Sequence, residues 1–559
     1  MSSTSTERPL KWPGPSRSLY ARYKRVAIAT DNGICSGIGR DVFMLGGNSI
    51  DAAVAALICI GVVNPQSSGL GGGFLMTIYN SSSKRCTVVN ARETAPASAS
   101  ETMFNDSPED ALRGYRAIAT PSELHGLWTV FSTFGSGKLS WHRLFEPSIE
   151  LALKGFPISS ALAKELAKAE EMILAEPSLK RVFVNPTTEK VYGEGDIITR
   201  DRLGATLQRI ANSSDPLQLF YRGSIARTIA AEIKERGGHI SMDDLSNYKT
   251  KLDEIPIITK QFLGEYAMCG PPPPSSAAIA QSIISTVAEF YDGKSEIDKD
   301  DPLFYHRLIE AEKFAYAQRT KFGDAEFVPE AQGIAENIVE SSYLKHIKSL
   351  IKQTAQPLNT YGADLFQQLD DHGTSHVSAI DRNNNIAVSC TSTVNRILGA
   401  MRVSPTLGIV WNNEMDDFSI PGQPNSFGYA PSPANYIRPG KRPLSSMSPT
   451  VKMVIGASGG SYIISAIAQT VIRNLILNET IKEAVDSPRF HNQLLPPNTL
   501  YESSIPQEII TNLADKRNHS MTATSKLKSV VQALVINTDG YIYGNSDFRR
   551  ETECFPAGF

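Results

Sequence analysis

Polar and apolar residues alternate most clearly in two runs of the chain, residues 374–380 and 386–393. The runs flank a polar turn, residues 381–385, that holds three consecutive asparagines. Alternation with a period of two predicts strands, and a short polar turn between two such strands predicts an antiparallel hairpin. If this hairpin is centred between Asn383 and Asn384, Thr374 lies opposite Thr393.

The remaining pattern predicts a layered protein with strands and many helices. Residues 50–63 form an apolar helix that begins after Asn48 or Ser49, and residues 351–370 form a polar, exposed and mobile linker. Strands are expected at 26–30, 74–79, 86–90 and 451–455, and a second hairpin at 529–537 and 541–544. Helices are expected at 144–154, 159–175, 203–211, 222–236, 275–291, 303–316 and 462–476. These helices form the outer layers of the expected fold.

Composition indicates a large globular protein with an ordinary core. The chain has 559 residues, of which 41% are hydrophobic and 20% charged, and its formal net charge is -3. This charge predicts no nucleic-acid partner. The longest apolar run, residues 52–63, is shorter than the roughly 18 residues of a membrane-spanning helix, so we interpret it as buried.

Residues 1–25 are polar and basic, and we expect a disordered leader with no signal peptide or membrane anchor. Six cysteines show neither a CxxC pair nor the Cys/His spacing of a metal site, so no metal and no cofactor are predicted. Five N-x-S/T acceptor sequences occur, a number close to chance for this length. The glycine-rich run 69–73 begins like the nucleotide-binding motif G-x-G-x-x-G, but Phe74 takes the position of the last glycine of that motif. These glycines therefore predict close backbone packing.

Thr374 is the candidate nucleophile. A threonine hydroxyl needs a base, and no Ser/His/Asp order is evident that would supply one. At a new chain end, however, a threonine carries its own base in the α-amine, and Gly373 leaves room for attack on the preceding carbonyl. A cut at this bond yields a large subunit, residues 26–373 after the leader, and a small catalytic subunit, residues 374–559.

Several motifs in order carry a family resemblance. They are NPQSSGLGGGFLM, VVNARETAP, HISMDDLSNY, YHRLIEAEKFAYAQRT, GTSHVSAIDRNNNIAVSCTSTVN, GIVWNNEMDDFSIPG, PSPANYIRPGKRPLSSMSPT and VIGASGGS. Together they resemble the γ-glutamyltranspeptidase family, also called glutathione hydrolases, over nearly all of the chain after about residue 25. The resemblance implies an α+β fold: a four-layer αββα sandwich of the N-terminal nucleophile hydrolase type, with two stacked, mainly antiparallel sheets flanked by helices.

The resemblance also implies roles for individual residues. Thr374 is the nucleophile and Thr393 holds its hydroxyl, while Gly459 and Gly460 form the oxyanion hole. The α-carboxylate of a γ-glutamyl substrate is bound by Arg92, Ser445 and Ser446. Its α-ammonium group is bound by Glu414 and Asp417, with the assistance of Asn395. Residues 426–442 resemble a lid loop, and structural hydrogen bonds are expected for His372 and His376.

The expected activity is γ-glutamyl transfer from glutathione and its conjugates to water, amino acids or dipeptides. The two subunits are expected to stay associated. A disulfide between Cys35 and Cys59 is similar to one in animal members of the family; two buried thiols are the alternative. Family members act at the extracellular face of the plasma membrane, and a cytoplasmic location is the alternative. Two other functions stay open: an autoprocessing acylase for other amides, and an unprocessed, inactive binding protein.

Overall fold

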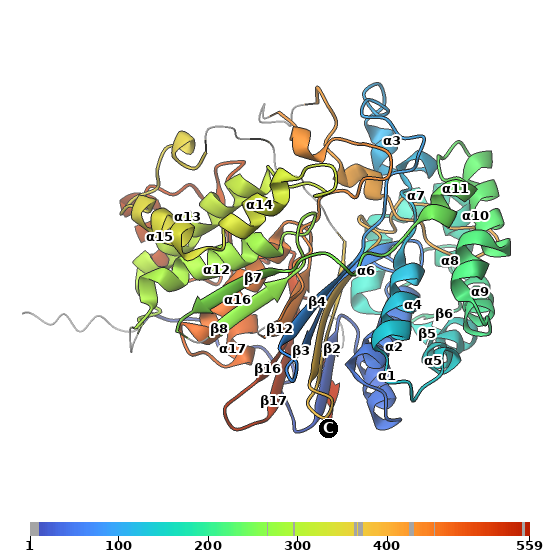
Figure 1. The fold of residues 1–559 in the computed structure, drawn as a ribbon, viewed down its shortest axis with the longest axis horizontal. Helices are drawn as coiled ribbons and strands as arrows, with labels where there is room; N and C mark the ends of the chain where they lie inside the picture. The colour runs from blue at the N-terminus through green and yellow to red at the C-terminus, as the bar shows by residue number, and fades with distance from the viewer. Residues whose placement is uncertain are drawn as a thin grey trace, which may run out of the picture.

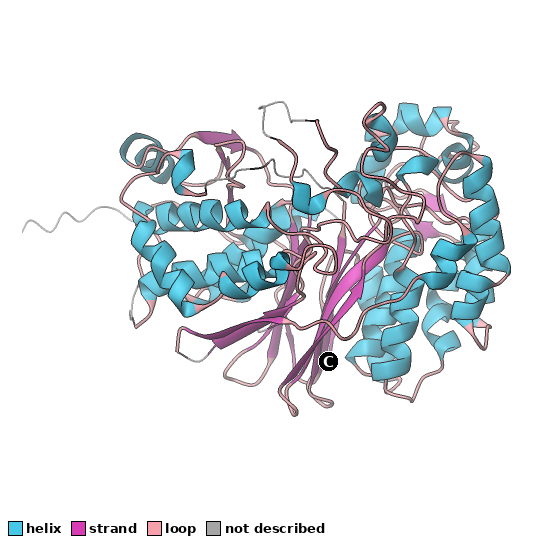
Figure 2. Cartoon of the chain, turned by 45° about the horizontal axis from the view of Figure 1, so that its top comes forward, coloured by secondary structure: helices cyan, strands magenta, loops and turns pink. Residues whose placement is uncertain are grey.

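Two facing sheets lie at the centre of the computed structural model, and helices cover both outer faces (Figures 1 and 2). The structure describes residues 10–264, 266–293, 297–362, 366, 373–423, 430–451, 453–550 and 554–559. The two sheets and the helices on their outer faces form the predicted αββα sandwich. None of the helices in these ranges combines the length and the apolar character needed to cross a membrane.

The six-stranded sheet contains the predicted central hairpin. Its strand order is β18-β2-β9-β10-β3-β4. Their bounds are β18 Ala557–Gly558, β2 Val26–Thr30, β9 Ser375–Asp381, β10 Ile386–Thr393, β3 Gly73–Asn80 and β4 Arg85–Ala91. Ser375 pairs with Ser392, so the same register continued by one residue sets Thr374 opposite Thr393, as predicted.

The seven-stranded sheet has the order β1-β17-β16-β12-β11-β8-β7. The bounds are β1 Ala21–Tyr23, β17 Ile542–Ser546, β16 Val530–Ile536, β12 Val454–Ser458, β11 Thr450–Val451, β8 Tyr266–Gly270 and β7 Ile257–Phe262. The single strand predicted at 451–455 is wrong, because the chain reverses and Val451 pairs with Val454. Both halves of the reversal are apolar and buried, so hydrophobicity alone does not mark the turn.

Helices packed on the six-stranded sheet come from the N-terminal part of the chain (Figure 1). Helix α2, Ser49–Val63, is buried as predicted, and the Asn48 side chain caps it. The other helices of this half are α1 Gly33–Met44, α3 Glu109–Leu112, α4 Glu123–Phe134, α5 Trp141–Lys154, α6 Ser160–Lys168, α7 Glu170–Ala175, α8 Pro177–Phe183, α9 Asp201–Ala211, α10 Ser224–Glu235 and α11 Met242–Asn247. The helix predicted at 159–175 is divided at Ala169, whereas the helix predicted at 222–236 is confirmed as α10 and follows a π-helical turn, Gln218–Arg222.

The opposite face of the sandwich combines helices from both halves of the chain. Helices α12 and α16 pack against each other over the seven-stranded sheet. The bounds here are α12 Ala277–Tyr291, α13 Pro302–Arg319, α14 Glu330–Asn337, α15 Ser341–Leu350, α16 Tyr462–Leu475, α17 Ile481–Asp486 and α18 Gln507–Thr511. Two small sheets complete the fold: β5 Phe156–Pro157 with β6 Ile197–Ile198, and β13 Phe490–His491 with β14 Thr499–Glu502 and β15 Met521–Thr524.

Residues 10–25 are not a disordered leader, so that prediction is wrong for this range. The Trp12 indole donates a hydrogen bond of 2.7 Å to Asp300, Ser16 binds Asp486, and β1 pairs with β17. The polar composition hid these attachments, because polar side chains can be satisfied by a protein surface as well as by water. Residues 1–9 lie outside the described ranges.

Two disulfides lie in the first 270 residues. Cys35 and Cys59 join α1 to α2, which confirms the pairing expected from the resemblance. Cys86 of β4 and Cys269 of β8 join one sheet to the other, 183 residues apart in sequence, and were not predicted. A bond between distant strands depends on the way the sheets stack, which sequence spacing does not reveal.

The predicted linker is anchored at Tyr361, which corrects the expectation that it is exposed throughout. Tyr361 is only 3% exposed, and its hydroxyl donates to the Glu310 carboxylate at 2.9 Å. Residues 363–365 and 367–372, which include the part nearest Thr374, lie outside the described ranges.

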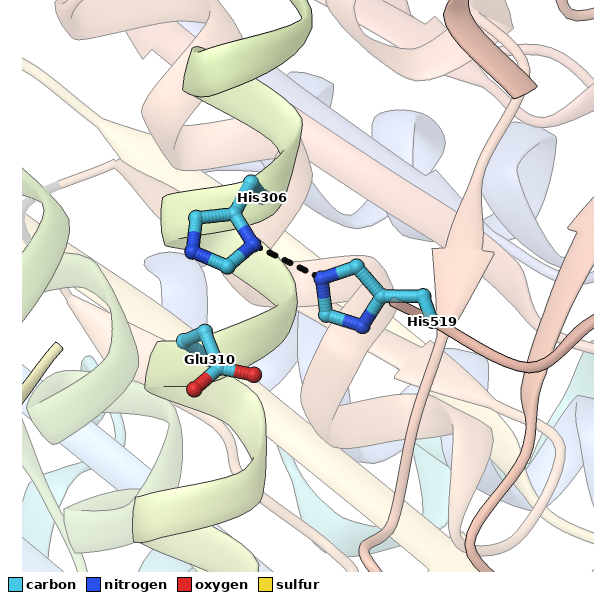
Figure 3. A group of neighbouring side chains, drawn as sticks. All are labelled: His306, Glu310 and His519. Carbon is cyan, nitrogen blue, oxygen red and sulfur yellow. Dashed lines mark hydrogen bonds between the residues drawn. The ribbon is translucent and has the colours of Figure 1, made fainter. Parts of the chain in front are cut away.

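A buried polar cluster lies beside this anchor (Figure 3). His306 and Glu310 are on α13, and His519 follows α18 in the C-terminal part of the chain. The two imidazoles contact each other at 2.8 Å, between His306 Nδ1 and His519 Nε2. Because His306 Nε2 faces the Lys352 carbonyl oxygen at 2.9 Å, it carries the ring proton, and Nδ1 accepts from His519. The cluster thus joins segments on either side of the Gly373–Thr374 bond.

Replacing His519 with alanine is expected to destabilise the protein by about 1–3 kcal/mol, because it leaves His306 Nδ1 buried without a donor. Denaturant unfolding followed by tryptophan fluorescence would measure the change. His346→Ala, on the exposed face of α15, is the matched control and is expected to have little effect. Equal stability of the two variants would contradict this account of the cluster.

Candidate active site

Thr374 lies immediately before β9, in a buried position between the two sheets. The Gly459 amide donates a hydrogen bond of 3.0 Å to Thr374 Oγ1. The Thr393 hydroxyl donates to the carbonyl oxygen of Gly373 at 2.8 Å, and it accepts from the Asn395 amide at 2.6 Å. In the uncut chain, Thr393 therefore contacts the carbonyl that precedes Thr374, and no bond from it to the Thr374 hydroxyl is seen among the described contacts.

Glycine is sterically required at three positions around the threonine. Gly373 has φ +76°, and a side chain there would collide with the Asn395 carbonyl. Gly459 has φ +118°, and an added Cβ would lie 2.6 Å from the Lys528 carbonyl oxygen. Gly72 packs directly against the Thr393 carbonyl, which confirms the prediction that the glycine-rich run serves close packing. These glycines bring backbone groups near Thr374 that larger residues would keep apart.

Arg92 follows β4 and is fully buried. Its guanidinium forms ion pairs with Glu414 Oε2 at 2.7 Å and with Asp417, while Glu93 Oε2 lies 3.6 Å away. Burial alone would lower the pKa of Arg92, but Glu414 and then Asp417 raise it above its usual value, so this arginine stays charged.

A small cavity brings most of the predicted residues together. Its lining consists of Arg92, Thr374, Thr393, Asn395, Asp417, Ser445, Met447, Gly460 and Ile463. Its volume is about 10 Å³, roughly the room for one water molecule. Arg92 and Asp417 both line this space and contact each other, so a ligand larger than water can lie between them only if this pair separates.

The two predicted serines have different surroundings. Ser445 lines the cavity, and its hydroxyl accepts from the Met447 amide at 3.1 Å. Ser446 instead accepts a hydrogen bond of 2.7 Å from Arg319, a buried residue at the end of α13. Sequence reasoning missed Arg319, although the motif YHRLIEAEKFAYAQRT contains it, because an arginine at a helix end usually faces solvent.

Two further buried carboxyl groups near the site were not predicted. Burial raises the pKa of Glu93 to about 8, against the opposing effect of Arg92. Burial also raises the pKa of Glu123 to about 8, although its carboxylate accepts a hydrogen bond of 2.9 Å from Ser392, the residue next to Thr393. The position of Glu93 directly after Arg92 was the available sequence signal.

His376 has the structural role that was expected. Its ring nitrogens contact the hydroxyls of Thr391 at 2.8 Å and Ser378 at 3.0 Å. Burial lowers its pKa to about 3, so it stays neutral. His372 and residues 426–429 of the predicted lid lie outside the described ranges.

The cluster in Figure 3 is the one group in the described ranges that could offer three ligands to a metal ion, through His306, Glu310 and His519. The Lys313 ammonium, however, lies 2.8 Å from Glu310 and 3.3 Å from His519. A divalent cation bound there would be repelled by this charge at close range, and the hydrogen bonds already satisfy the imidazoles. The surroundings fit a structural network better than a metal site.

Glu123→Gln is expected to stabilise the protein at alkaline pH. The raised pKa means that the folded state holds a proton that the unfolded state releases near pH 4.5, so stability is full below pH 4.5 and is lost as the pH rises to about 8. Glutamine removes this loss and can still accept from Ser392. The melting temperature of the variant should exceed that of the wild type by about 2–4 °C at pH 9 and match it at pH 4.5. The exposed substitution Glu235→Gln is the control, and a difference independent of pH would contradict the assignment.

Comparison with known proteins identifies relatives of this chain. The sequence profile of the family described as Gamma-glutamyltranspeptidase matches residues 35–557. The chain is 39% identical to Scoloptoxin SSD14 of Scolopendra dehaani, covering 96% of this chain and 93% of that protein. It is also 39% identical to Glutathione hydrolase 2 of Arabidopsis thaliana, covering 95% and 93%. Among solved structures, cephalosporin acylase from Bacillus halodurans has the same fold, with a TM-score of 0.80, 20% identity and 99% coverage of both chains. A profile match over almost the whole chain, together with relatives of this identity, shows that the chain belongs to the γ-glutamyltranspeptidase family.

Proposed function

We propose that this protein is a γ-glutamyltransferase with glutathione hydrolase activity, and that Thr374 is its nucleophile. The observation that carries the proposal is the shared cavity, in which the Thr374 hydroxyl lies with a buried cation, Arg92, and a carboxylate, Asp417. A γ-glutamyl group presents an ammonium, a carboxylate and an amide carbonyl, and the cavity offers a complement to each.

The first reaction is cleavage of the chain itself. Thr374 Oγ1 attacks the Gly373 carbonyl carbon, the amide C–N bond breaks, and the hydroxyl proton passes to the Thr374 nitrogen. Thr393 supports this step: because its oxygen accepts from the Asn395 amide, its proton points to the Gly373 carbonyl oxygen, where negative charge develops. Water then hydrolyses the ester. The products are a Gly373 carboxylate and a Thr374 that carries a free amine.

The freed amine then serves as the base for substrate cleavage. Thr374 Oγ1 attacks the γ-carbonyl of the substrate, its proton passes through the α-amine to the leaving nitrogen, and a γ-glutamyl ester remains. Water or the amine of an acceptor amino acid or dipeptide attacks this ester and regenerates the hydroxyl. The Gly459 amide, 3.0 Å from Oγ1, and Gly460 beside it are the donors for the oxyanion.

Specificity follows from the closed ion pair. The substrate ammonium can replace Arg92 as the partner of Asp417 and Glu414. The substrate carboxylate can in turn replace these two carboxylates as the partner of Arg92, and Ser445 assists it. Every buried charge then keeps a partner. An acyl group without these two charges has no means of opening the pair, which argues against the alternative of an acylase for other amides.

The two subunits are proposed to stay together after the cut, and the location is proposed to be the cell surface. Two disulfides support an oxidising compartment, since such bonds are rare in the cytosol.

Thr374→Ala is expected to remain a single chain, because the attacking hydroxyl is gone, and to release no chromophore from γ-glutamyl-4-nitroanilide. Denaturing gel electrophoresis of the wild type should show two fragments that meet at the Gly373–Thr374 bond. Thr374→Ser keeps a hydroxyl and should retain cleavage at a reduced rate. An active wild-type protein with an intact bond would refute the mechanism, and a persistent, inactive single chain would favour the inactive homologue.

Asp417→Asn is expected to lower kcat/KM for the same anilide by about 10²–10³-fold, because it removes one charged partner of the buried Arg92 and leaves the substrate ammonium with Glu414 alone. The neighbouring variant Asp416→Asn, whose carboxylate pairs with Arg396, is the control and should change kcat/KM by less than about 3-fold. Both variants should be scored after cleavage into two fragments, which shows that they fold. Similar kinetics for the two would contradict the proposed role of Asp417.

A further inference from the structure

A large space lies at the end of the sandwich opposite Thr374, where β2, β3, β16 and β17 reach the lower edge of Figure 1. Its volume is about 1330 Å³, and both sheets contribute to its lining. Thr374 precedes β9, whereas Ile380 and Asp381, at the other end of this strand, line the space. We call this space the distal trough. It is separate from the cavity that contains the candidate nucleophile.

The Cys86–Cys269 disulfide forms part of the wall of the distal trough. Cys86 is half-buried on β4, an edge strand of the six-stranded sheet, and Cys269 is 6% exposed. The other disulfide is fully enclosed, because both Cys35 and Cys59 are 0% exposed. A thiol exchanges with a disulfide only where it can reach a sulfur atom. The two disulfides therefore differ in the access that they give to a dissolved thiol.

Positive charge surrounds the accessible disulfide. Lys24, Arg25, Lys84 and Arg382 all line the distal trough, and all four are exposed. Lys84 is two residues before Cys86 in the sequence. The side chains of Lys24, Arg25 and Lys84 have no acidic partner in the part of the chain that the structure describes. These three cations are available to a ligand.

The acidic residues among the described lining do not cancel this charge. Asp539 pairs with Arg22 and Glu479 pairs with Arg473, and neither arginine belongs to the lining. Asp381 is buried, and its carboxylate accepts hydrogen bonds from backbone amides of the turn that follows it. The distal trough thus has an excess of positive charge, which raises the local concentration of small anions.

We propose that the distal trough is a thiol–disulfide exchange site, at which a small anionic thiol opens the Cys86–Cys269 bond. The thiolate attacks Sγ of Cys86, the more exposed cysteine, and the S–S bond breaks. Cys269 leaves as a thiolate and takes a proton from water, and a mixed disulfide remains on Cys86. A second thiolate then displaces Cys86 from the mixed disulfide. Two small thiols are thereby oxidised to one disulfide, and the protein disulfide is reduced to two thiols.

The charge of the distal trough selects among small thiols. Glutathione carries two carboxylates and one ammonium group, so it is a net anion at neutral pH, and the volume of the trough exceeds that of most sites for small molecules. The proposed substrate of this protein would then act at a second place on the same molecule. This identification of the thiol rests on the proposed function. The exchange itself depends only on the disulfide and the charges around it.

Opening the bond removes a link between the two sheets. Cys86 is on β4 and Cys269 is on β8, 183 residues apart in sequence, and the other described disulfide joins two helices instead. A disulfide that closes a long loop stabilises a protein by restricting its unfolded chain. The consequence of exchange is therefore a less stable sandwich.

Differential alkylation with mass spectrometry tests the access of thiols to the two disulfides. Free thiols of the full-length wild type are blocked with N-ethylmaleimide, and the folded protein is incubated with 3-mercaptopropionate or cysteamine. These thiols have similar sizes and opposite charges, and neither contains a γ-glutamyl group. Newly formed thiols are then alkylated with iodoacetamide. The label should appear on Cys86 and Cys269 before it appears on Cys35 and Cys59.

The selection by charge is measured as the rate of opening by 3-mercaptopropionate divided by the rate of opening by cysteamine. In the double variant Lys24→Gln, Lys84→Gln, this ratio should fall about 2- to 10-fold, the range expected for the loss of two exposed charge interactions. The control Lys234→Gln, on the exposed surface of α10, should leave the ratio unchanged. Simultaneous opening of both disulfides, opening of neither, or an unchanged ratio in the double variant overturns the inference.

The melting temperature tests the consequence of exchange. Treatment with 3-mercaptopropionate should lower it by about 3–10 °C in the wild type, because a crosslink over a long loop is lost. The same treatment should not change it in Cys86→Ser, Cys269→Ser, and an equal fall in that variant overturns the assigned consequence. If that variant does not fold, the alkylation assay decides. A wild type that turns over no γ-glutamyl anilide refutes the proposed function but leaves the exchange site standing.

Discussion

The register between β9 and β10 is the constraint on which the rest of the site depends. Because Ser375 pairs with Ser392, the next pair in the register is Thr374, just before β9, and Thr393, the last residue of β10. The two threonines therefore lie side by side at the end of these strands. The Thr393 hydroxyl then reaches the Gly373 carbonyl, and Gly72 allows the neighbouring backbone to close over Thr393. A shift of one residue would turn every side chain of the hairpin to the opposite face and separate this pair.

Charge compensation is the second principle of the site. Three buried carboxylates, those of Glu93, Glu414 and Asp417, lie within ion-pair distance of the Arg92 guanidinium. Burying charged groups costs free energy unless each charge has a partner, and this cost rises steeply when one partner is lost. A zwitterionic ligand can replace the internal contacts without leaving a charge alone. The proposed site would therefore select its ligand first by the pattern of its charges.

Sequence reasoning recovered the features that local patterns determine. Period-two alternation placed the hairpin and hence the pair of threonines, while helical periodicity placed α2, α9, α12 and α16 within a few residues. Arg92 and Asp417 were found through motif resemblance alone, since an isolated charged residue carries no sign of burial. Their juxtaposition with Thr374 in one cavity needed the structure, as did the division between Ser445 and Ser446.

The features that sequence did not reveal depend on distant contacts. The pKa of Glu123 is raised because tertiary packing buries its side chain, and Cys86 meets Cys269 only because the sheets stack. The chain reversal between Val451 and Val454 and the anchoring of Tyr361 by Glu310 have the same origin. In each case the residue type alone favoured a surface or a simple strand, and tertiary packing decided otherwise.

If the proposed cut at the Gly373–Thr374 bond takes place, the strand order determines how the two pieces are held together. In the six-stranded sheet, β2, β3 and β4 come from before Thr374, whereas β18, β9 and β10 come from after it, and the two sets interleave. Both disulfides in the described ranges lie within the first segment, so they do not tie the two pieces together. The strands of the two pieces instead alternate within the sheets, so the pieces can separate only if the hydrogen bonds of both sheets are broken. Exchange of one piece between molecules should therefore be as slow as global unfolding.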